Sequence, residues 1–145
     1  MSNHPAREYR AVGAEQGNGI PVGAEPTIPS ECQRGGELNA AVTSALVGIH
    51  HRYLGRGPKT ASTFHHGNVV VTLMYDVLTH AEKSLIDSRR ADVVHQTRHL
   101  FQETMEADFR EAIERLTGRR VIAFISGDSV ESDVAAELFI LDEPL

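Results

Sequence analysis

Residues 55–60, which read GRGPKT, carry the residue types of a phosphate-binding loop. A Walker loop places four residues between its first glycine and its Gly-Lys pair, and it leads from a strand into a helix. Here Pro58 stands in the place of the second glycine, and a predicted helix precedes the loop while a predicted strand follows it. A helix that ends at the loop presents the wrong sign of dipole to a phosphate. We therefore reject a Walker site and keep Arg56 and Lys59 as a candidate patch for a carboxylate or a bicarbonate-sized anion.

The eight histidines offer a second chemistry. His95 and His99 are four residues apart, which places both imidazoles on one helix face at a spacing that metal ligands use. No glutamate follows in an HExxH arrangement, and the adjacent pair His50 and His51 points in two directions on a helix. We expect exposed or packed histidines, with weak metal binding at His95 and His99 as the alternative.

No catalytic set is recognisable. Residues 126–129 (SGDS) are expected to form a turn in which Asp128 bonds its own backbone. The glutamates of residues 103–114 are expected to form a solvated helix face, with Arg110 four residues after Glu106. Cys32 is the single cysteine, so the chain can form no internal disulfide, CxxC pair or cysteine-rich zinc site. The sequence predicts a protein that is not an enzyme and has no cofactor.

Arg98 is the polar residue best suited to a specific role, because it lies one turn from the apolar residues Val94 and Phe101 in a predicted helix. Two interpretations follow from that position. Arg98 is either a buried donor in an ion pair, or it holds an anionic partner.

Length and composition limit the classes of function. The chain has 145 residues, of which 41% are hydrophobic and 23% charged, as in an ordinary one-domain globular protein. A net charge of -6 argues against nucleic-acid binding. No run reaches the roughly 18 apolar residues needed to cross a bilayer, and the first residues lack the pattern of a secretory signal. We expect a cytoplasmic protein without direct membrane insertion.

The composition changes near Gly36. Residues 1–36 hold four of the six prolines and half of the twelve glycines. Such a segment buries too little apolar surface to offset the entropy of ordering it, so we expect a disordered arm. Two interpretations of the arm stay open, a segment without function and an interaction tail. Residues 37–145 are the expected folded domain.

Apolar periodicity predicts the elements of that domain. A helix from Leu38 ends at Gly55, and a hairpin turns around residues 65–68. Thr79 and Glu82 form the capping box of a second helix, which either breaks or continues across the polar residues 87–92; we favour the break. The following helix ends at Gly118, and a second hairpin turns within residues 126–132.

The order helix, hairpin, one or two helices, hairpin predicts an α+β fold in a single domain. Strands joined by short turns are antiparallel, so we expect one four-stranded antiparallel sheet covered on one face by helices. In the strand at residues 69–76, Val69, Val71, Leu73 and Tyr75 share one face, and Val70, Thr72 and Met74 share the other.

The motifs YLGRGP, VVVTLMYDVLTHAEKSL, VHQTRHLF, IERLTGRRVIAFISGD and LFILD, between Leu38 and Leu141, resemble the MpsC-like domain. This small bacterial family is a domain of unknown function named after component C of a Na+-translocating membrane-potential-generating system. Arg98 also matches the family pattern, whereas the family's glycine is missing near Arg89 and Arg90. The most specific matches are the structural residues Gly55, Gly57, Pro58, Thr79, Glu82 and Gly118.

The resemblance implies a soluble accessory or regulatory interaction module associated with a membrane ion or bicarbonate transport system. Its expected partners are a membrane transport component and further copies of the same chain, and a homo-oligomer could form through the free edge of the sheet. The alternative function is a small-anion or metal-binding protein that uses the basic turn and the histidines.

Overall fold

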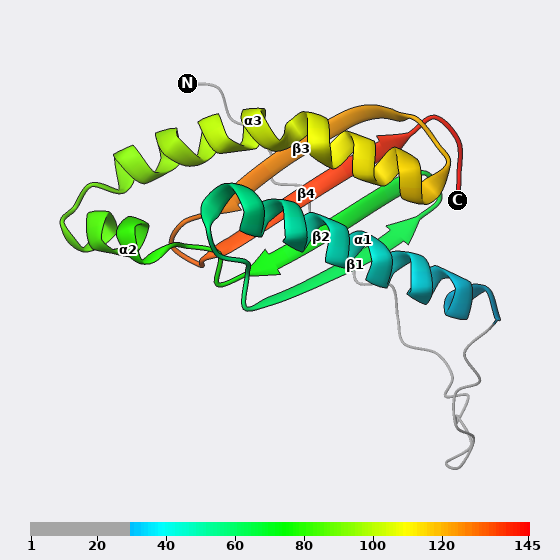
Figure 1. Cartoon of the computed structure of the whole chain (residues 1–145), viewed down its shortest axis with the longest axis horizontal. Helices are drawn as coiled ribbons and strands as arrows, with labels where there is room; N and C mark the ends of the chain where they lie inside the picture. Colours follow the sequence, from blue (N-terminus) through cyan, green and yellow to red (C-terminus); the bar gives the residue numbers. More distant parts are fainter. Residues whose placement is uncertain (1–29) are drawn as a thin grey trace, which may run out of the picture.

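The computed structural model describes residues 30–145, with side chains described from Gly35 onward (Figure 1). Seven elements follow one another in the predicted order of helix, hairpin, two helices and hairpin. They are α1 (Ser30–Leu54), β1 (Thr60–His66), β2 (Val69–Tyr75), α2 (His80–Asp87), α3 (Ala91–Thr117), β3 (Val121–Ser129) and β4 (Val134–Leu141).

The four strands form one antiparallel sheet in the order β1-β2-β4-β3. The two hairpins meet at its centre, where β2 pairs with β4 and Val71 stands opposite Leu138. The predicted α+β fold with a single four-stranded antiparallel sheet is confirmed.

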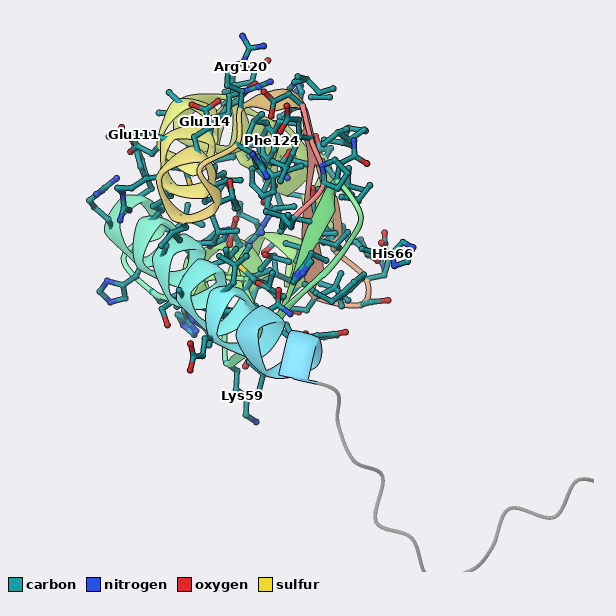
Figure 2. The ribbon with its side chains drawn as sticks, turned by 90° about the vertical axis from the view of Figure 1, so that its right-hand side faces the viewer. Lys59, His66, Glu111, Glu114, Arg120 and Phe124 are labelled. Carbon is teal, nitrogen blue, oxygen red and sulfur yellow. The ribbon has the colours of Figure 1, made fainter. Side chains whose placement is uncertain are left out.

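The long helices α1 and α3 lie across the same face of the sheet, and α2 packs beside the start of α3 (Figure 1). Figure 2 views the molecule from one end, with both long helices to one side of the sheet. Their apolar faces and the inner face of the sheet enclose the core, as predicted for helices with a three-to-four-residue apolar repeat. Its buried residues are Val42, Leu46, Ile49, Val70, Met105, Phe109, Ala112, Ile113, Val121, Phe139 and Leu141.

Both predicted helix-ending glycines adopt the left-handed conformation. Gly55 has a φ of 76° and donates its N–H to the carbonyl of His51 at 2.9 Å. Gly118 has a φ of 67° and bonds the carbonyl of Glu114 in the same way, also at 2.9 Å. A side chain at such a position costs free energy, so glycine is the residue that ends a helix most readily in this way.

The predicted break between the second and third helices is confirmed, because α2 ends at Asp87 and α3 begins at Ala91. Arg89 lies in the break with a φ of 59°. This is the left-handed region, which non-glycine residues rarely occupy. The family pattern has a glycine at this point. The backbone of Arg89 has the left-handed conformation that a glycine would adopt most easily.

The second hairpin corrects one prediction. Residues 126–129 do not form a turn, because Ser126 pairs with Glu137 and Ser129 pairs with Val134 as part of β3. The chain turns at residues 130–133 instead. The side chain of Asp128 accepts a hydrogen bond from Gln102 on α3 at 3.3 Å, so it serves the packing between helix and sheet. Asp128 suggested a turn because aspartate is common in turns. The local sequence gives no sign of the contact with Gln102.

The expected disordered arm, residues 1–36, lies mostly outside the described residues. Where the description begins, α1 starts at Ser30, so residues 30–36 belong to a helix. Within residues 30–145, none of the helices is both long and apolar enough to cross a bilayer.

Candidate functional site

The basic turn that follows α1 holds the segment that follows β2. Arg56 donates from Nη1 to the carbonyl of Leu78 at 2.6 Å and from Nη2 to the carbonyl of Asp76 at 3.1 Å. Its guanidinium also lies 3.3 Å from the Asp76 carboxylate. Beside it, Gly57 lies so close to α1 that a Cβ atom would come 3.4 Å from Cγ1 of Val47. The turn thus joins the end of α1 to the start of α2.

A buried ion pair that involves α3 holds the same segment. Arg98 of α3 donates from Nη2 to Oε2 of Glu82 and to the carbonyl of Val77, both at 3.0 Å. The side chains of Arg98 and Glu82 are 5% and 10% exposed, so neither charge has much access to water. Removing either partner of a buried ion pair lowers the stability of the fold strongly, because the other charge is left buried and unpaired.

Glu82 has a second task at the start of α2. Its Oε2 accepts a hydrogen bond from the backbone N–H of Thr79 at 2.6 Å, and the Thr79 hydroxyl accepts one from the N–H of Glu82 at 3.2 Å. This is the predicted capping box. The same carboxylate therefore starts the helix and neutralises Arg98.

Asp133, in the turn between β3 and β4, completes the attachment. Its Oδ1 accepts hydrogen bonds from the N–H groups of Val77 and Leu78 at 2.8 and 2.9 Å. Three side chains from distant parts of the sequence, Arg56, Arg98 and Asp133, thus hold residues 76–78.

A groove of about 290 Å³ lies beside this ion pair. Its exposed lining residues Ala81 and Leu85 open it to the surface, and its volume is near the lower end of ligand pockets. The residues that line the groove are Tyr53, Leu54, Thr79, Ala81, Glu82, Leu85, Val94, Thr97 and Phe101.

The polar side chains of the groove already have partners within the chain. The Tyr53 hydroxyl donates to Oδ2 of Asp108 at 2.7 Å, and that hydrogen bond is the main cause that holds the pKa of Asp108 below its ordinary value. The Thr97 hydroxyl donates to the carbonyl of Val93 at 2.8 Å. Thr79 and Glu82 bond each other in the capping box. The groove therefore offers shape and apolar surface, with few free polar groups.

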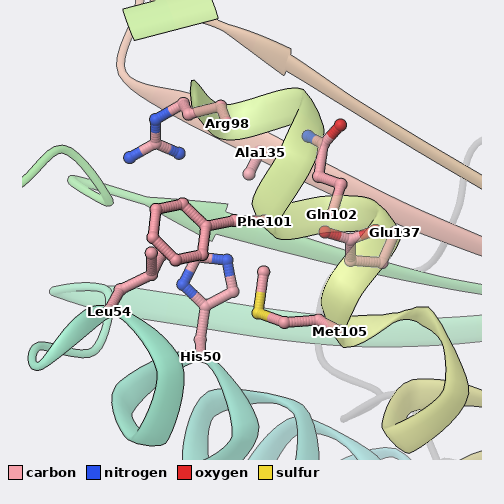
Figure 3. A pocket seen from close by; sticks show the side chains of 8 residues that line it. All are labelled: His50, Leu54, Arg98, Phe101, Gln102, Met105, Ala135 and Glu137. Atoms are coloured by element: carbon pink, nitrogen blue, oxygen red, sulfur yellow. The ribbon is translucent and has the colours of Figure 1, made fainter. Parts of the chain in front are cut away.

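A second, much smaller cavity of about 10 Å³ lies deeper, between the helices and the sheet (Figure 3). Leu54 and Phe101 line both the groove and this inner cavity. His50 of α1, Arg98 of α3 and Glu137 of β4 are among the residues that line it. Its volume corresponds to roughly one water molecule.

The inner cavity adjoins a polar row that crosses the helix-covered face of the sheet. Thr63, Thr72, Glu137 and Ser126 stand opposite one another on the four successive strands. The hydroxyls of Thr63 and Thr72 are 2.8 Å apart, and Thr43 of α1 donates to Thr63 at 2.8 Å. The members of the row on β1 and β2 are thus hydrogen-bonded.

On and beside the β4 and β3 end of the row, several buried polar atoms have no hydrogen-bond partner among the described residues. They include both carboxylate oxygens of Glu137, Nδ1 of His50, Nε of Arg98, the hydroxyl of Ser126 and Oδ2 of Asp128. Buried polar atoms are usually hydrogen-bonded, and one water-sized molecule in the inner cavity could serve the atoms that face it.

Burial shifts the acid–base properties of this cluster. Glu137 is fully buried, and that burial raises its pKa to about 8, with the nearby Asp128 adding to the rise while the Ser126 hydroxyl opposes it. Burial, together with the charge of Arg98, lowers the pKa of His50 to about 4. Near neutral pH both side chains are therefore uncharged.

The structure does not gather the residues that the sequence singled out for ligands into one site. Arg56 and Arg98 bond to adjacent carbonyls of residues 76–78, whereas Lys59 is exposed beyond the turn. His95 and His99 are exposed on α3, and His99 lies 3.3 Å from Glu103. Among the side chains that the structure describes, no three of His, Cys, Asp and Glu come together as a metal site.

Sequence reasoning missed His50, Asp133 and Glu137. A signal existed for Glu137, because the period of two places it on the same face as the core residues Phe139 and Leu141. His50 directly follows the buried Ile49 on the predicted helix, and the helical period alone does not show that both are buried. Asp133 bonds residues 55 and 56 positions away in the chain, so no local pattern reveals it.

The family model described as "Na+-translocating membrane potential-generating system (MpsC)" matches residues 34–143. No curated protein and no solved structure matches the chain. The family match covers α1 from its second turn and every later element. It includes the capping box, the buried ion pair, both cavities and the glycines that end α1 and α3. The chain therefore belongs to the MpsC family.

Proposed function

We propose that this chain is an accessory or regulatory interaction module of a membrane ion-translocating system, acting from the cytoplasmic side without catalysing a reaction. Membership of the MpsC family, whose description names a Na+-translocating membrane potential-generating system, supports the link to ion transport. Self-association through β1 or β3, the outer strands of the described sheet, is part of the same proposal.

One observation carries the choice of an interaction module over an enzyme. The groove is lined mainly by apolar side chains, and its four polar side chains, Tyr53, Thr79, Glu82 and Thr97, make hydrogen bonds within the chain. Catalysis requires groups that are free to bond substrate, whereas docking requires shape and apolar area. The groove therefore suits roughly one or two large apolar side chains of a partner protein.

The surroundings of the groove also favour docking. The contacts of Arg56, Arg98 and Asp133 fix the segment that leads into α2, and α2 forms one wall. A preformed wall loses little conformational entropy when a partner binds.

The alternative, a small-anion or metal-binding protein, has weaker support. The guanidinium of Arg56 is occupied by two backbone carbonyls and by Asp76, and Arg98 is occupied by Glu82 and by the Val77 carbonyl. Lys59, His95 and His99 are exposed and stay candidates for weak binding.

Co-expression with the membrane subunits of the ion-translocating system tests the proposal. Leu85→Lys places a charge in the groove, where Leu85 is 36% exposed, and Leu100→Lys places the same charge on α3 outside the groove, where Leu100 is 62% exposed. The measurements are co-purification in detergent and the Na+-dependent membrane potential of inverted vesicles.

We expect the unaltered chain and Leu100→Lys to co-purify with the membrane subunits and to change the potential. Leu85→Lys should lose both effects while it stays folded by circular dichroism. Co-purification of Leu85→Lys at the level of the unaltered chain would refute the groove as the docking site. If the unaltered chain neither co-purifies nor changes the potential, the transport role itself is wrong.

A further inference from the structure

The face of the sheet that points away from the helices carries an almost continuous apolar surface. Alternation along the strands places its residues opposite to the core-facing ones, and Figure 2 shows His66, at one end of β1, pointing away from the helices. We call this surface the open face. Its apolar members are Phe64, Val69, Val71, Leu73, Tyr75, Ala123, Ile125, Val134, Ala136, Leu138 and Ile140.

The pairing of the strands makes this surface contiguous. Phe64, Val71, Leu138 and Ile125 stand opposite one another in a single row across all four strands. At the two ends of the row, Phe64 is 51% exposed and Ile125 is 59% exposed. Large apolar side chains this exposed in one patch mark an interaction surface more often than an ordinary protein surface.

The open face is also free of charge. Its remaining positions on the four strands are Thr60, Ser62, His66, Gly127 and Ser129, none of which is Asp, Glu, Lys or Arg. The chain as a whole has a formal net charge of -6. Two copies of this chain therefore repel each other least through this face, and a partner that binds through charge finds no complement on it.

We propose that the occupant of the open face is a second copy of this chain, so that two sheets pack face to face with the helices outside. This inference deepens the self-association included in the proposed function and does not depend on the transport role. It replaces pairing through a sheet edge by packing of whole sheet faces, as in a β-sandwich.

The dimensions of the sheet are consistent with a dimer. Four strands at about 4.8 Å spacing and seven residues at about 3.3 Å each give a face of roughly 19 by 23 Å. Two such faces cover about 900 Å² in plan, and the relief of the side chains adds to this area. The total approaches the roughly 1,000 Å² expected of a specific interface, so the open face is large enough for a weak dimer.

The geometry also predicts which residues meet. A two-fold axis that runs along the strands between β2 and β4 places β1 of one copy over β3 of the other. Phe64 then lies over Ile125 of the second copy, and Val71 over Leu138. Phe64 and Ile125, the two strongly exposed members of this row, therefore cover each other at the outer strands.

Sedimentation equilibrium of the full chain from low to high micromolar concentration tests the inference. Ile125→Lys puts a charge in the open face, and Leu100→Lys puts the same charge at an equally exposed site on α3. We expect the unaltered chain and Leu100→Lys to reach the mass of two chains. Ile125→Lys should stay at the mass of one chain over the same range, a loss of at least 10-fold in association, while its circular dichroism stays unchanged.

Other outcomes overturn the inference. If Ile125→Lys dimerises as well as Leu100→Lys does, self-association holds but uses another surface, such as an edge strand. If the unaltered chain stays a monomer throughout, self-association is absent. A monomer that binds vesicles of anionic or zwitterionic lipid through the open face would assign that face to a membrane. A protein that is monomeric as the full chain and dimerises only when residues 1–29 are removed would assign the open face to that segment.

Discussion

Replacing Glu137 by glutamine tests the acid–base state of the buried polar row. The substitution removes the ionisable group at the centre of the sheet and keeps the size and most of the polarity of the side chain. Since Glu137 is fully buried, its carboxyl group can be neutral in the fold and charged in the unfolded chain at the same pH. Stability should then depend on pH through this residue.

The size of the effect follows from the two pKa values. Burial raises the pKa of Glu137 from 4.5 to about 8 in the fold. Between these values the folded protein holds a proton that the unfolded chain has lost, so the free energy of unfolding falls as the pH rises. At about 1.4 kcal/mol per pKa unit, the full loss is roughly 4 to 5 kcal/mol, complete only above the folded pKa.

The contribution of His50 to the free energy of unfolding changes with pH in the opposite direction, and it does so in a lower pH range. Its pKa falls from 6.5 to about 4 in the fold, so its contribution is complete above pH 6.5 and is lost as the pH falls. The loss caused by Glu137 is therefore clearest at neutral and higher pH. His50 is present in both proteins, so the comparison of Glu137→Gln with the wild type largely removes its influence.

Urea denaturation at about pH 6 and about pH 8 measures the effect. From the lower to the higher pH, we expect the free energy of unfolding of the wild type to fall by roughly 2 kcal/mol more than that of Glu137→Gln. A low and constant protein concentration keeps any association from contributing. The control is Glu111→Gln, which removes an exposed carboxylate from α3 and should leave the pH dependence as in the wild type.

A parallel loss of stability in Glu137→Gln and the wild type would refute the reasoning. It would mean that Glu137 is already ionised in the fold near neutral pH, with its charge balanced by a group such as Arg98. The inner cavity would then hold an ion pair, and the polar row would have no proton to release.

Two further substitutions test the packing around α2. Arg98→Met leaves the buried Glu82 carboxylate without its cation, so we expect the free energy of unfolding to fall by about 3 to 5 kcal/mol in urea, with partial recovery when Glu82→Gln is added. An Arg98→Met protein as stable as the wild type would show that the ion pair contributes nothing. Arg89→Gly relieves the left-handed conformation in the break between α2 and α3, and thermal unfolding should show a gain of about 0.5 to 1 kcal/mol. A loss of stability would mean that the Arg89 side chain makes a contact worth more than the strain.

Local rules in the sequence were sufficient for most of the elements. Gly55 and Gly118 end their helices in the predicted way, and Thr79 with Glu82 starts α2 as the capping box requires. These signals work because a cap, a two-residue turn or a helical period involves residues within about four positions of one another. The one misplaced turn, at residues 126–129, fails for the same reason, since Asp128 bonds a residue on a distant helix.

The candidate sites depended on contacts that no local rule contains. The sequence suggested Arg56 as an anion-binding residue. In the fold its guanidinium donates to two backbone carbonyls 20 and 22 positions away. Arg98 was recognised as important, but its partner Glu82 was recognised only as a cap. Residues such as these converge because two helices and a hairpin turn pack against one segment, and that packing is decided by the whole core.

The sequence by itself determined the order of the elements, the antiparallel hairpins and the two faces of β2. The tertiary structure decided which of those faces the helices would cover. Val69, Val71, Leu73 and Tyr75 are as apolar as the residues on the covered face, so alternation alone cannot tell the core from the open face. The choice also buries Glu137 and Thr72, because they share their strands' inner face with the core. Burial is a property of the assembled layers, and it sets both the pKa of Glu137 and the surface that is left for a second copy.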